Sequence, residues 1–324
     1  MPDARSVRSP DDDDLALARD VVERELAMTP VLAAPQLGDG VVLKLETLLP
    51  TGSFKVRGGL VAASVAADDG TAVIAASAGN HGLGVAYGAA RYGLPATVVV
   101  PVTASAKKVQ ALEQFDLTLV RHGDNYDAAE RYALDMATAD PNLRFVSPYN
   151  DPHTIAGQAT IATELLAQVP DVSTVIVPIG GGGLISGVAL GLAAAGRRDV
   201  RIVGVVAEAS PAMRRAVEVG HPDPVTILPT LADGLAGNIE PASITVGIAS
   251  AYVESIVGVT EDQIAAAIRF LAFEHGVVSE GSGAVGVAAL QSGRVAAGLL
   301  DGRTALLITG RNIAAATLSK ILTP

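Results

Sequence analysis

The feature that most constrains the fold of this chain is a repeated alternation of short apolar runs with longer helical segments. The apolar runs are rich in Val and Ile and occupy residues 41–46, 72–77, 96–101, 117–123, 144–149, 173–179, 200–208 and 304–309. Segments between them, such as 53–67 and 153–169, keep the apolar spacing of a helix. This pattern predicts βαβ units, in which helices cover both faces of a parallel sheet.

The number of apolar runs exceeds what one compact sheet would hold, so we expect two α/β domains. A ligand is expected in the cleft between their sheets, beyond the carboxyl ends of the strands. The chain has 324 residues, of which 49% are hydrophobic but only 3% are aromatic. This composition suits helices rich in small aliphatic residues packed on a buried parallel sheet.

Charge and cysteine content exclude several classes of protein. The net charge of −11 argues against a surface that binds nucleic acid or an anionic membrane. The absence of cysteine excludes disulfides, cysteine-bound metals and thiol nucleophiles. The first residues lack the apolar segment of a signal peptide, and no apolar run is long enough to cross a bilayer. We therefore expect a soluble, cytoplasmic protein whose partner is a small molecule, with no nucleic acid and no membrane.

Four consecutive glycines, Gly180 to Gly183, join a β-branched strand to a helix. Because glycine has no Cβ, several backbone N–H groups can point toward one place, and the positive end of the helix adds to the attraction for an anion. We interpret the loop as a phosphate-binding site rather than as a plain turn. A dinucleotide site stays open on these residues alone, since Glu208 ends the next strand where a ribose-binding acid would lie.

A second turn from a strand to a helix has the sequence ASAGNHGLG, residues 76–84. Ser77 and Asn80 could simply cap the helix. Alternatively, exposed N–H groups and the Asn80 amide could bind a carboxylate. His81 lies on the same turn, and a single histidine in such a place is more often a structural hydrogen-bonding residue than an acid–base group.

The segment PTGSFKVRGG, residues 50–59, contains the only obvious nucleophile, Lys55. A lysine amine that is shielded from water has a lowered pKa and can form a Schiff base with an aldehyde. A lysine that merely reaches from a helix start to solvent is the simpler interpretation, but two anion-binding turns in the same chain favour a chemical role. A ligand with both a phosphate and an aldehyde is pyridoxal 5′-phosphate (PLP).

Taken together, these motifs resemble the serine/threonine dehydratase family of fold-type II PLP enzymes, which also contains serine racemases. The resemblance runs from TPVLAAPQL at 29–37 to LLITGRNI at 306–313, and SPYNDPHTIAGQATIA, TLADGLA and EGSGA match in order. It implies a fold like that of the tryptophan synthase β chain, with two parallel-sheet α/β domains and the cofactor in the cleft. It also implies a small domain at 50–150, inserted into a large PLP-binding domain formed by residues 1–49 and 151–324.

The resemblance assigns a role to each motif. Lys55 would be the catalytic, PLP-linked lysine, Phe54 would pack near the ring, and Asn80 would bond to the phenolic oxygen of the cofactor. The phosphate would be held by Gly180, Gly181, Gly182, Gly183 and Leu184. The substrate would be bound by Ser77, Ala78, Gly79, Asn80, His81 and Tyr149.

Thr309 resembles the family residue that faces the pyridine nitrogen of the cofactor. A hydroxyl does not hold that nitrogen protonated as an aspartate would, which favours loss of a β-substituent over transamination. Many metal-activated members carry an acid six positions after the glutamate that matches Glu208, but this chain has Arg214 there. Because a cationic side chain would repel Mg²⁺ or Ca²⁺ and could pair with Glu208, we expect no metal.

The resemblance implies a PLP-dependent ammonia-lyase, also called a dehydratase, that converts a small β-hydroxy amino acid of the L-threonine or L-serine type to a 2-oxo acid and ammonia. One alternative is a dehydratase for a hydroxyectoine-degradation product or 3-hydroxyaspartate. A serine racemase, a β-replacement enzyme and a PLP carrier without activity also stay open. Racemases of the family carry a serine where this chain has Ala78, which favours the lyase. We expect a homodimer or a homotetramer.

Overall fold

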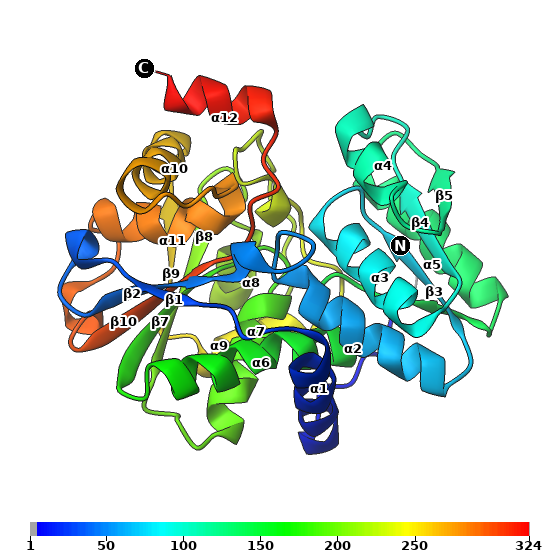
Figure 1. The fold of residues 1–324 in the computed structure, drawn as a ribbon, viewed down its shortest axis with the longest axis horizontal. Helices are drawn as coiled ribbons and strands as arrows, with labels where there is room; N and C mark the ends of the chain where they lie inside the picture. Colours follow the sequence, from blue (N-terminus) through cyan, green and yellow to red (C-terminus); the bar gives the residue numbers. More distant parts are fainter. Residues whose placement is uncertain (1–4, 324) are drawn as a thin grey trace.

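The computed structural model describes residues 5–323, which form two lobes with a sheet in each (Figure 1). The larger sheet has six strands: β1 (Val31–Ala33), β2 (Val41–Leu45), β7 (Val172–Pro178), β8 (Arg201–Ala207), β9 (Ser255–Val259) and β10 (Arg303–Ile308). Their order is β1-β2-β10-β7-β8-β9. The pair of β1 with β2 is antiparallel and the other pairs are parallel.

The smaller sheet has four strands, all paired in parallel in the order β5-β4-β3-β6. They are β3 (Ala72–Ala76), β4 (Ala96–Val100), β5 (Thr118–Arg121) and β6 (Leu143–Phe145). All four lie inside the predicted inserted domain. The exact division of the chain at residues 50 and 150 stays a prediction.

Twelve α-helices surround the sheets within the described residues. They are α1 (Asp12–Glu25), α2 (Lys55–Asp68), α3 (Asn80–Tyr92), α4 (Ala106–Leu112), α5 (Tyr126–Ala139), α6 (Pro152–Gln168), α7 (Gly183–Ala194), α8 (Ala212–Val219), α9 (Ile244–Tyr252), α10 (Glu261–His275), α11 (Gly281–Gln291) and α12 (Ala315–Leu322). Short 3₁₀ turns occupy Pro35–Leu37, Glu46–Leu48, Asp233–Leu235 and Ala297–Leu299. No helix in residues 5–323 combines the length and apolar character needed to span a membrane.

The predicted alternation is confirmed, because every predicted apolar run overlaps a strand. The strand β7 shows why these runs read as continuously apolar. Val175 and Val177 face one core, shared with α6 and α7, whereas Ile176 faces a second core, shared with α10 and α11. Since helices cover both faces of the sheet, neither face of the strand can be polar.

Helices α2 and α3 approach each other so closely that their backbones touch. A Cβ built on Gly59 would lie 2.2 Å from the carbonyl oxygen of Gly84. A Cβ on Gly84 would lie 2.7 Å from the carbonyl oxygen of Lys55. Such distances leave no room for a side chain, so the glycines of the SFKVRGG and NHGLG motifs serve the packing of these two helices.

A buried ion network fixes α2 to the larger lobe. The Nε of Arg57 lies 2.7 Å from Oε2 of Glu46, and its Nη1 lies 2.7 Å from Oε1 of Glu164 on α6. Lys44 of β2 completes the network at 2.6 Å from Oε2 of Glu164. Because removal of one partner from a buried pair leaves an uncompensated charge, this network strongly constrains the position of α2.

Candidate active site

Lys55 is the first residue of α2, and α2 begins where the two lobes meet (Figure 1). Its Nζ donates a hydrogen bond of 2.6 Å to the carbonyl oxygen of Pro148 and lies 5.1 Å from the centre of the Phe54 ring. Burial lowers the pKa of Lys55 to about 8, against a smaller opposing effect of the Glu280 carboxylate. The unprotonated amine, which a nucleophile or general base requires, is therefore far more populated near neutral pH than for a lysine with the usual pKa.

The loop that carries Lys55 is held against the end of β10. The backbone N–H of Phe54 donates to the carbonyl of Thr309 at 3.0 Å, and that of Arg311 donates to the carbonyl of Gly52 at 2.9 Å. Thr309 is only 2% exposed. The structure thus brings two motifs that are distant in the sequence, TGSFK and LITGRN, to one place.

The four-glycine loop lies between β7 and α7. Gly182 has φ of +91° and is the N-cap of α7, where it supplies no side-chain cap. Within residues 5–323, the N–H groups of Gly181, Gly182 and Gly183 have no hydrogen-bond partner. Unpaired N–H groups at a helix N-terminus are suited to a bound anion.

Tyr149 connects this loop to the lysine. A Cβ on Gly181 would lie 2.3 Å from a carbon of the Tyr149 ring, so the ring packs directly on the glycine backbone. The preceding residue, Pro148, supplies the carbonyl that accepts from Lys55. The hydroxyl of Tyr149 accepts from the N–H of Glu240 at 3.0 Å. The lysine and the glycine loop are therefore separated by a single short segment of chain.

The loop between β3 and α3 presents a second set of backbone donors. Ser77 Oγ accepts from the N–H of Gly79 at 3.1 Å. Asn80 begins α3, and no side chain caps this helix. The N–H groups of Ala78, Asn80 and His81 have no hydrogen-bond partner in the described part of the chain. These donors fit a carboxylate, and a Cβ on Gly79 would meet open space there.

The ring of His81 points away from this open space. Its Nε2 lies 2.8 Å from the carbonyl oxygen of Val146, which follows β6, and the residue is 4% exposed. Burial, followed by the charge of Lys55, lowers the pKa of His81 to about 3. The ring is therefore neutral and acts as a structural donor, so a contact of this residue with substrate would involve its backbone N–H.

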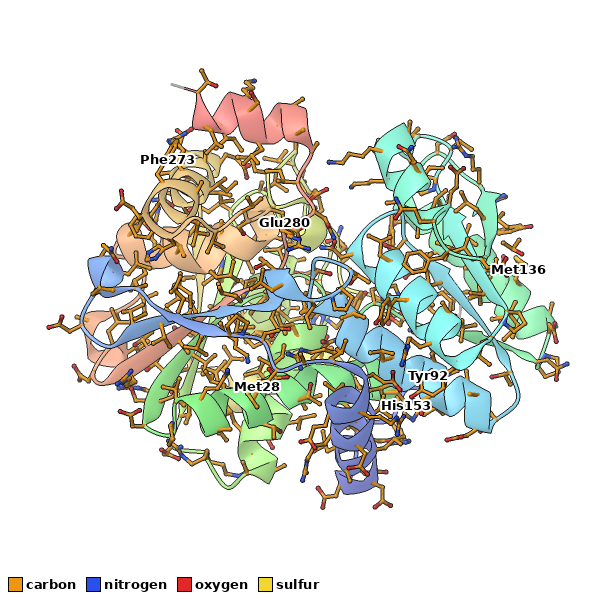
Figure 2. All side chains as sticks on the ribbon, viewed as in Figure 1. Met28, Tyr92, Met136, His153, Phe273 and Glu280 are labelled. Carbon is orange, nitrogen blue, oxygen red and sulfur yellow. The ribbon has the colours of Figure 1, made fainter. Side chains whose placement is uncertain are left out.

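Glu280 and Asn312 belong to the same region but had no assigned role in the sequence. Glu280 is 6% exposed and lies at the boundary of the two lobes (Figure 2). Its Oε1 accepts from Asn80 Nδ2 at 2.7 Å, and its Oε2 accepts from the N–H of Asn312 at 3.0 Å. Burial, with a contribution from Asp233, raises the pKa of Glu280 to about 7. The only signal in the sequence was the EGSGA motif, where an acid precedes a glycine-rich helix start.

Glu208 forms an ion pair, although its partner is not the expected one. Its Oε1 lies 3.4 Å from Nη2 of Arg294. Arg214 stands beside Glu208, since a Cβ on Gly258 would lie 2.9 Å from atoms of both side chains. Residues 5–323 contain no group of three or more His, Cys, Asp or Glu side chains arranged to hold a metal ion.

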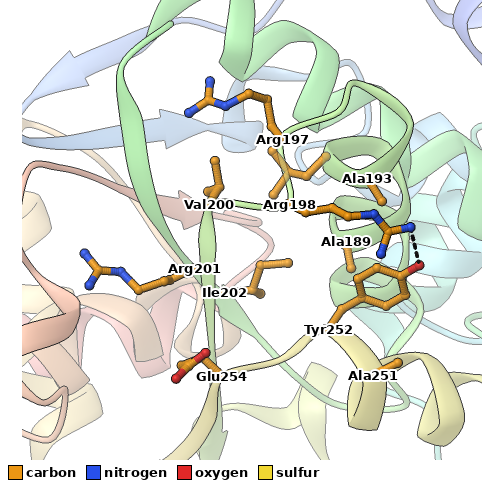
Figure 3. A pocket seen from close by; sticks show the side chains of 11 residues that line it. Ala189, Ala193, Arg197, Arg198, Val200, Arg201, Ile202, Ala251, Tyr252 and Glu254 are labelled. Atoms are coloured by element: carbon orange, nitrogen blue, oxygen red, sulfur yellow. Dashed lines mark hydrogen bonds between the residues drawn. The ribbon is translucent and has the colours of Figure 1, made fainter.

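A separate cavity of about 240 Å³ lies at the other end of β8, where Arg197, Arg198 and Arg201 surround an apolar floor (Figure 3). Arg197 donates to Asp199 at 2.9 Å and to the carbonyl of Val172. Arg201 donates to the carbonyl of Gly298 at 2.6 Å. The cavity contains none of the predicted site residues, and much of its positive charge is engaged by the chain itself.

Comparison with known proteins also points to a PLP-dependent enzyme. The sequence pattern of the family described as "Pyridoxal-phosphate dependent enzyme" matches residues 22–310. The L-threonine ammonia-lyase of Thermotoga maritima is 39% identical over 307 residues, which cover 94% of this chain and 75% of the relative.

Solved structures agree with the sequence match. Maize serine racemase superposes with a TM-score of 0.87 at 27% identity, over 97% of each chain. The processed form of threonine deaminase isoform 2 from Solanum lycopersicum gives a TM-score of 0.83 at 28% identity, over 98% of this chain and 95% of that one. These matches confirm the predicted fold-type II architecture.

The described residues also fit the cofactor of this family. The enclosed amine of Lys55 suits the aldehyde of PLP, and the unpaired N–H groups of Gly181 to Gly183 suit its phosphate. The nicotinamide alternative loses its support, because the family that matches residues 22–310 is pyridoxal-phosphate dependent. With the match over most of its length, the chain belongs to the family of pyridoxal-phosphate-dependent enzymes.

Proposed function

We propose that this chain is an ammonia-lyase that converts a small β-hydroxy amino acid, of the L-threonine or L-serine type, to a 2-oxo acid and ammonia. The observation that carries the proposal is the single enclosed amine of Lys55 between two sets of unpaired N–H donors. The relatives named as threonine ammonia-lyase and threonine deaminase support the same reaction.

Different residues of the chain are proposed to bind the substrate, to bind the cofactor and to transfer the proton. When bound, PLP supplies an electron sink for negative charge that develops at the substrate Cα. The N–H groups of Ala78, Asn80 and His81 are proposed to hold the substrate carboxylate. Those of Gly181 to Gly183, with Leu184 at the helix start, are proposed to hold the phosphate. Lys55 Nζ is the group that we propose removes the Cα proton, since its lowered pKa makes the amine available.

Loss of the β-hydroxyl as water follows removal of the Cα proton. The released enamine becomes an imine and takes up one water, which gives the 2-oxo acid and ammonia. The net change is therefore one amino acid to one oxo acid and one ammonia. Incubation of the holoenzyme with L-threonine, L-serine and 3-hydroxyaspartate, with oxo acid and ammonia both measured, tests the proposal and ranks the substrates. Production of neither product from any β-hydroxy amino acid would contradict it.

Ala78 favours elimination over racemisation. Inversion at Cα needs an acid–base group on each face of the substrate, and a methyl group cannot transfer a proton. Ala78 is only half-buried: its side chain contacts the edge of a core formed by Val98, Val100 and residues of α4 but is not enclosed by that core. Because the fold is similar to that of maize serine racemase, the elimination and racemisation reactions can be compared on the same architecture.

We expect Ala78→Ser to raise the ratio of racemisation to elimination by roughly 10² or more, the usual contribution of one positioned acid–base group. Chiral chromatography of L-serine incubated with each holoenzyme measures the ratio. Gly247→Ser, at a position where a Cβ meets open space, is a control with the same added hydroxyl. Rapid formation of D-serine by the unmodified chain would refute the single-face mechanism.

We propose that divalent cations do not activate this enzyme strongly. The support is the cationic surroundings of Glu208, which pairs with Arg294 and lies beside Arg214. Activity after EDTA treatment is expected to change by less than about twofold when Mg²⁺ or Ca²⁺ is added back, because two arginines oppose cation binding. A saturable, many-fold recovery would show that a cation site exists here.

We further propose that the chain works in the cytoplasm as a homodimer or homotetramer. Large apolar side chains on the surface support an assembly, among them Phe273, which is 67% exposed on α10 (Figure 2). Sedimentation velocity of the holoenzyme tests the assembly. A monomer at every concentration would contradict it.

A further inference from the structure

The carboxamide of Asn80 makes two side-chain hydrogen bonds across the boundary of the lobes. Its Nδ2 donates to Glu280 Oε1 at 2.7 Å, and its Oδ1 accepts from Asn312 Nδ2 at 2.6 Å. An ionised carboxylate only accepts hydrogen bonds, whereas the NH₂ group of an amide only donates them. These two partners therefore permit only one orientation of the Asn80 amide and leave one of its N–H bonds for another acceptor.

The orientation of Asn312 is itself fixed. Its Nδ2 donates to Asn80 and also to the carbonyl oxygen of Thr51 at 2.8 Å, so both N–H bonds are used. A backbone carbonyl accepts only, which prevents a flip of the Asn312 amide. The chain of bonds thus runs from Thr51, beside the PLP lysine loop, through Asn312 and Asn80 to Glu280.

Glu280 is held rigidly at the other end of this chain of bonds. Its backbone N–H donates to the carbonyl of Gly310 at 3.0 Å, and it is the N-cap of α11. A Cβ on Gly310 would lie 2.7 Å from Glu280 Oε1, so the glycine leaves space for the carboxylate. Nearly complete burial of a carboxylate is costly unless its oxygens accept hydrogen bonds, and here they accept from Asn80 and Asn312.

We propose that Glu280 and Asn312 are positioning residues, which orient the Asn80 carboxamide so that its remaining N–H donates to the phenolic oxygen of PLP. The inference rests on the role proposed for Asn80. Neither positioning residue needs to touch the cofactor. Their effect is exerted through the amide, because a reversed amide would present an oxygen to the phenolic oxygen and replace attraction by repulsion.

The test uses the balance between the two protonation tautomers of bound PLP, measured as the ratio of its two absorption bands in the holoenzyme. Loss of one hydrogen bond to the phenolic oxygen should change this ratio by about three- to tenfold. We expect such a change in Glu280→Gln. The glutamine amide has only one oxygen, so its NH₂ group must face one of the two N–H donors, either Asn80 Nδ2 or the backbone N–H of Asn312. We expect the same in Asn312→Asp, which places an acceptor against Asn80 Oδ1 and the Thr51 carbonyl.

Asn80→Ala separates failure of this inference from failure of the proposed role of Asn80. If Asn80→Ala leaves the band ratio unchanged, the role of Asn80 is wrong. If Asn80→Ala changes the ratio but Glu280→Gln and Asn312→Asp do not, the positioning proposal is wrong. In the double variant Asn80→Ala/Glu280→Gln, the second substitution should have no further effect on the ratio. An additive effect would show that Glu280 acts independently of Asn80.

Two controls distinguish positioning from general damage to the fold. Glu261→Gln removes a carboxylate that accepts from the N–H of Leu231 at 2.6 Å, and it should leave the band ratio unchanged. If Glu261→Gln changes the band ratio as much as Glu280→Gln does, the proposal is wrong. Circular dichroism of each protein without cofactor should match the unmodified chain, and Asn312→Asp provides the test at a solvent-exposed position if Glu280→Gln folds poorly.

A pH titration gives an independent measurement. Burial raises the pKa of Glu280 above the usual carboxyl range, and the charged groups that affect it are Asp233 and Lys108, while Glu280 in turn acts on Lys55. Protonation converts one acceptor oxygen into a donor, which disturbs the bonds to Asn80 and Asn312. The band ratio of the unmodified holoenzyme should therefore titrate near neutral pH, and Glu280→Gln should remove that transition. A transition that persists unchanged in the variant would contradict the proposal.

Discussion

Replacement of Lys55 by alanine is expected to abolish covalent attachment of PLP and to lower turnover by at least about a thousandfold, since it removes both the nucleophile and the proposed base. The amine of Lys55 has a pKa lowered to about 8 by burial and donates a hydrogen bond to the Pro148 carbonyl. Borohydride reduction followed by peptide mass spectrometry locates the attachment, and ammonia release measures turnover. Cofactor attached to another lysine would refute the assignment.

Two further variants make this result specific. Lys55→Arg keeps the positive charge but cannot supply a free amine, because the guanidinium stays protonated. It should be as inactive as Lys55→Ala. Lys320→Ala, on the exposed face of α12, removes the same charge from the chain far from the cleft and should retain full activity. Substantial activity in Lys55→Arg would mean that the residue acts only through its charge.

Replacement of Gly181 by aspartate is expected to weaken PLP retention by roughly 10² or more, which corresponds to about 3 kcal/mol for an introduced like charge and a displaced N–H donor. A Cβ at this position would already lie 2.3 Å from the Tyr149 ring, so the ring or the loop must move. The added carboxylate would then stand among N–H groups proposed to bind the phosphate dianion. Equilibrium dialysis of PLP against the protein without cofactor measures the change.

The matched control for this variant is Gly247→Asp. Gly247 lies on α9, has ordinary backbone geometry, and a Cβ there meets no atom within 4 Å. It adds the same charge without entering the loop, so PLP affinity should stay within about twofold of the unmodified protein. Equal losses in the two variants would indicate a general charge effect and would contradict the phosphate-site assignment.

Elements that repeat a simple pattern could be predicted from the sequence. The β-branched run at β7 is buried on both faces and adjoins four glycines, so its strand, its turn and its helix follow from local chemistry. β9 was not predicted, because its five residues, SIVGV, form a shorter run than any of the predicted ones. Its place beside β8 depends on pairing that local sequence does not specify.

The sequence predicts a role for a residue only where one local motif indicates one function, and the roles predicted in this way remain proposals. The motifs at Lys55, the glycine loop and the Asn80 loop each indicate a local backbone structure, namely a helix start or a turn from a strand to a helix. The Asn80–Glu280–Asn312 interaction could not be predicted in this way, since its three side chains come from positions about 200 and 30 residues apart along the chain. The ion pair of Glu208 with Arg294, rather than with Arg214, has the same cause. Both depend on tertiary packing, and no local spacing encodes them.

The backbone contact between α2 and α3 determines where this enzyme can tolerate mutation. A side chain at position 84 would press directly on the carbonyl of Lys55, and one at position 59 would press on the helix that begins with Asn80. Both positions lie inside helices, yet a single added methyl group would push apart the helix that begins with Lys55 and the helix that begins with Asn80. Activity therefore depends on the contact between α2 and α3 at Gly59 and Gly84. In a library of variants, we expect substitutions at these two glycines to be tolerated as poorly as substitutions in the active site.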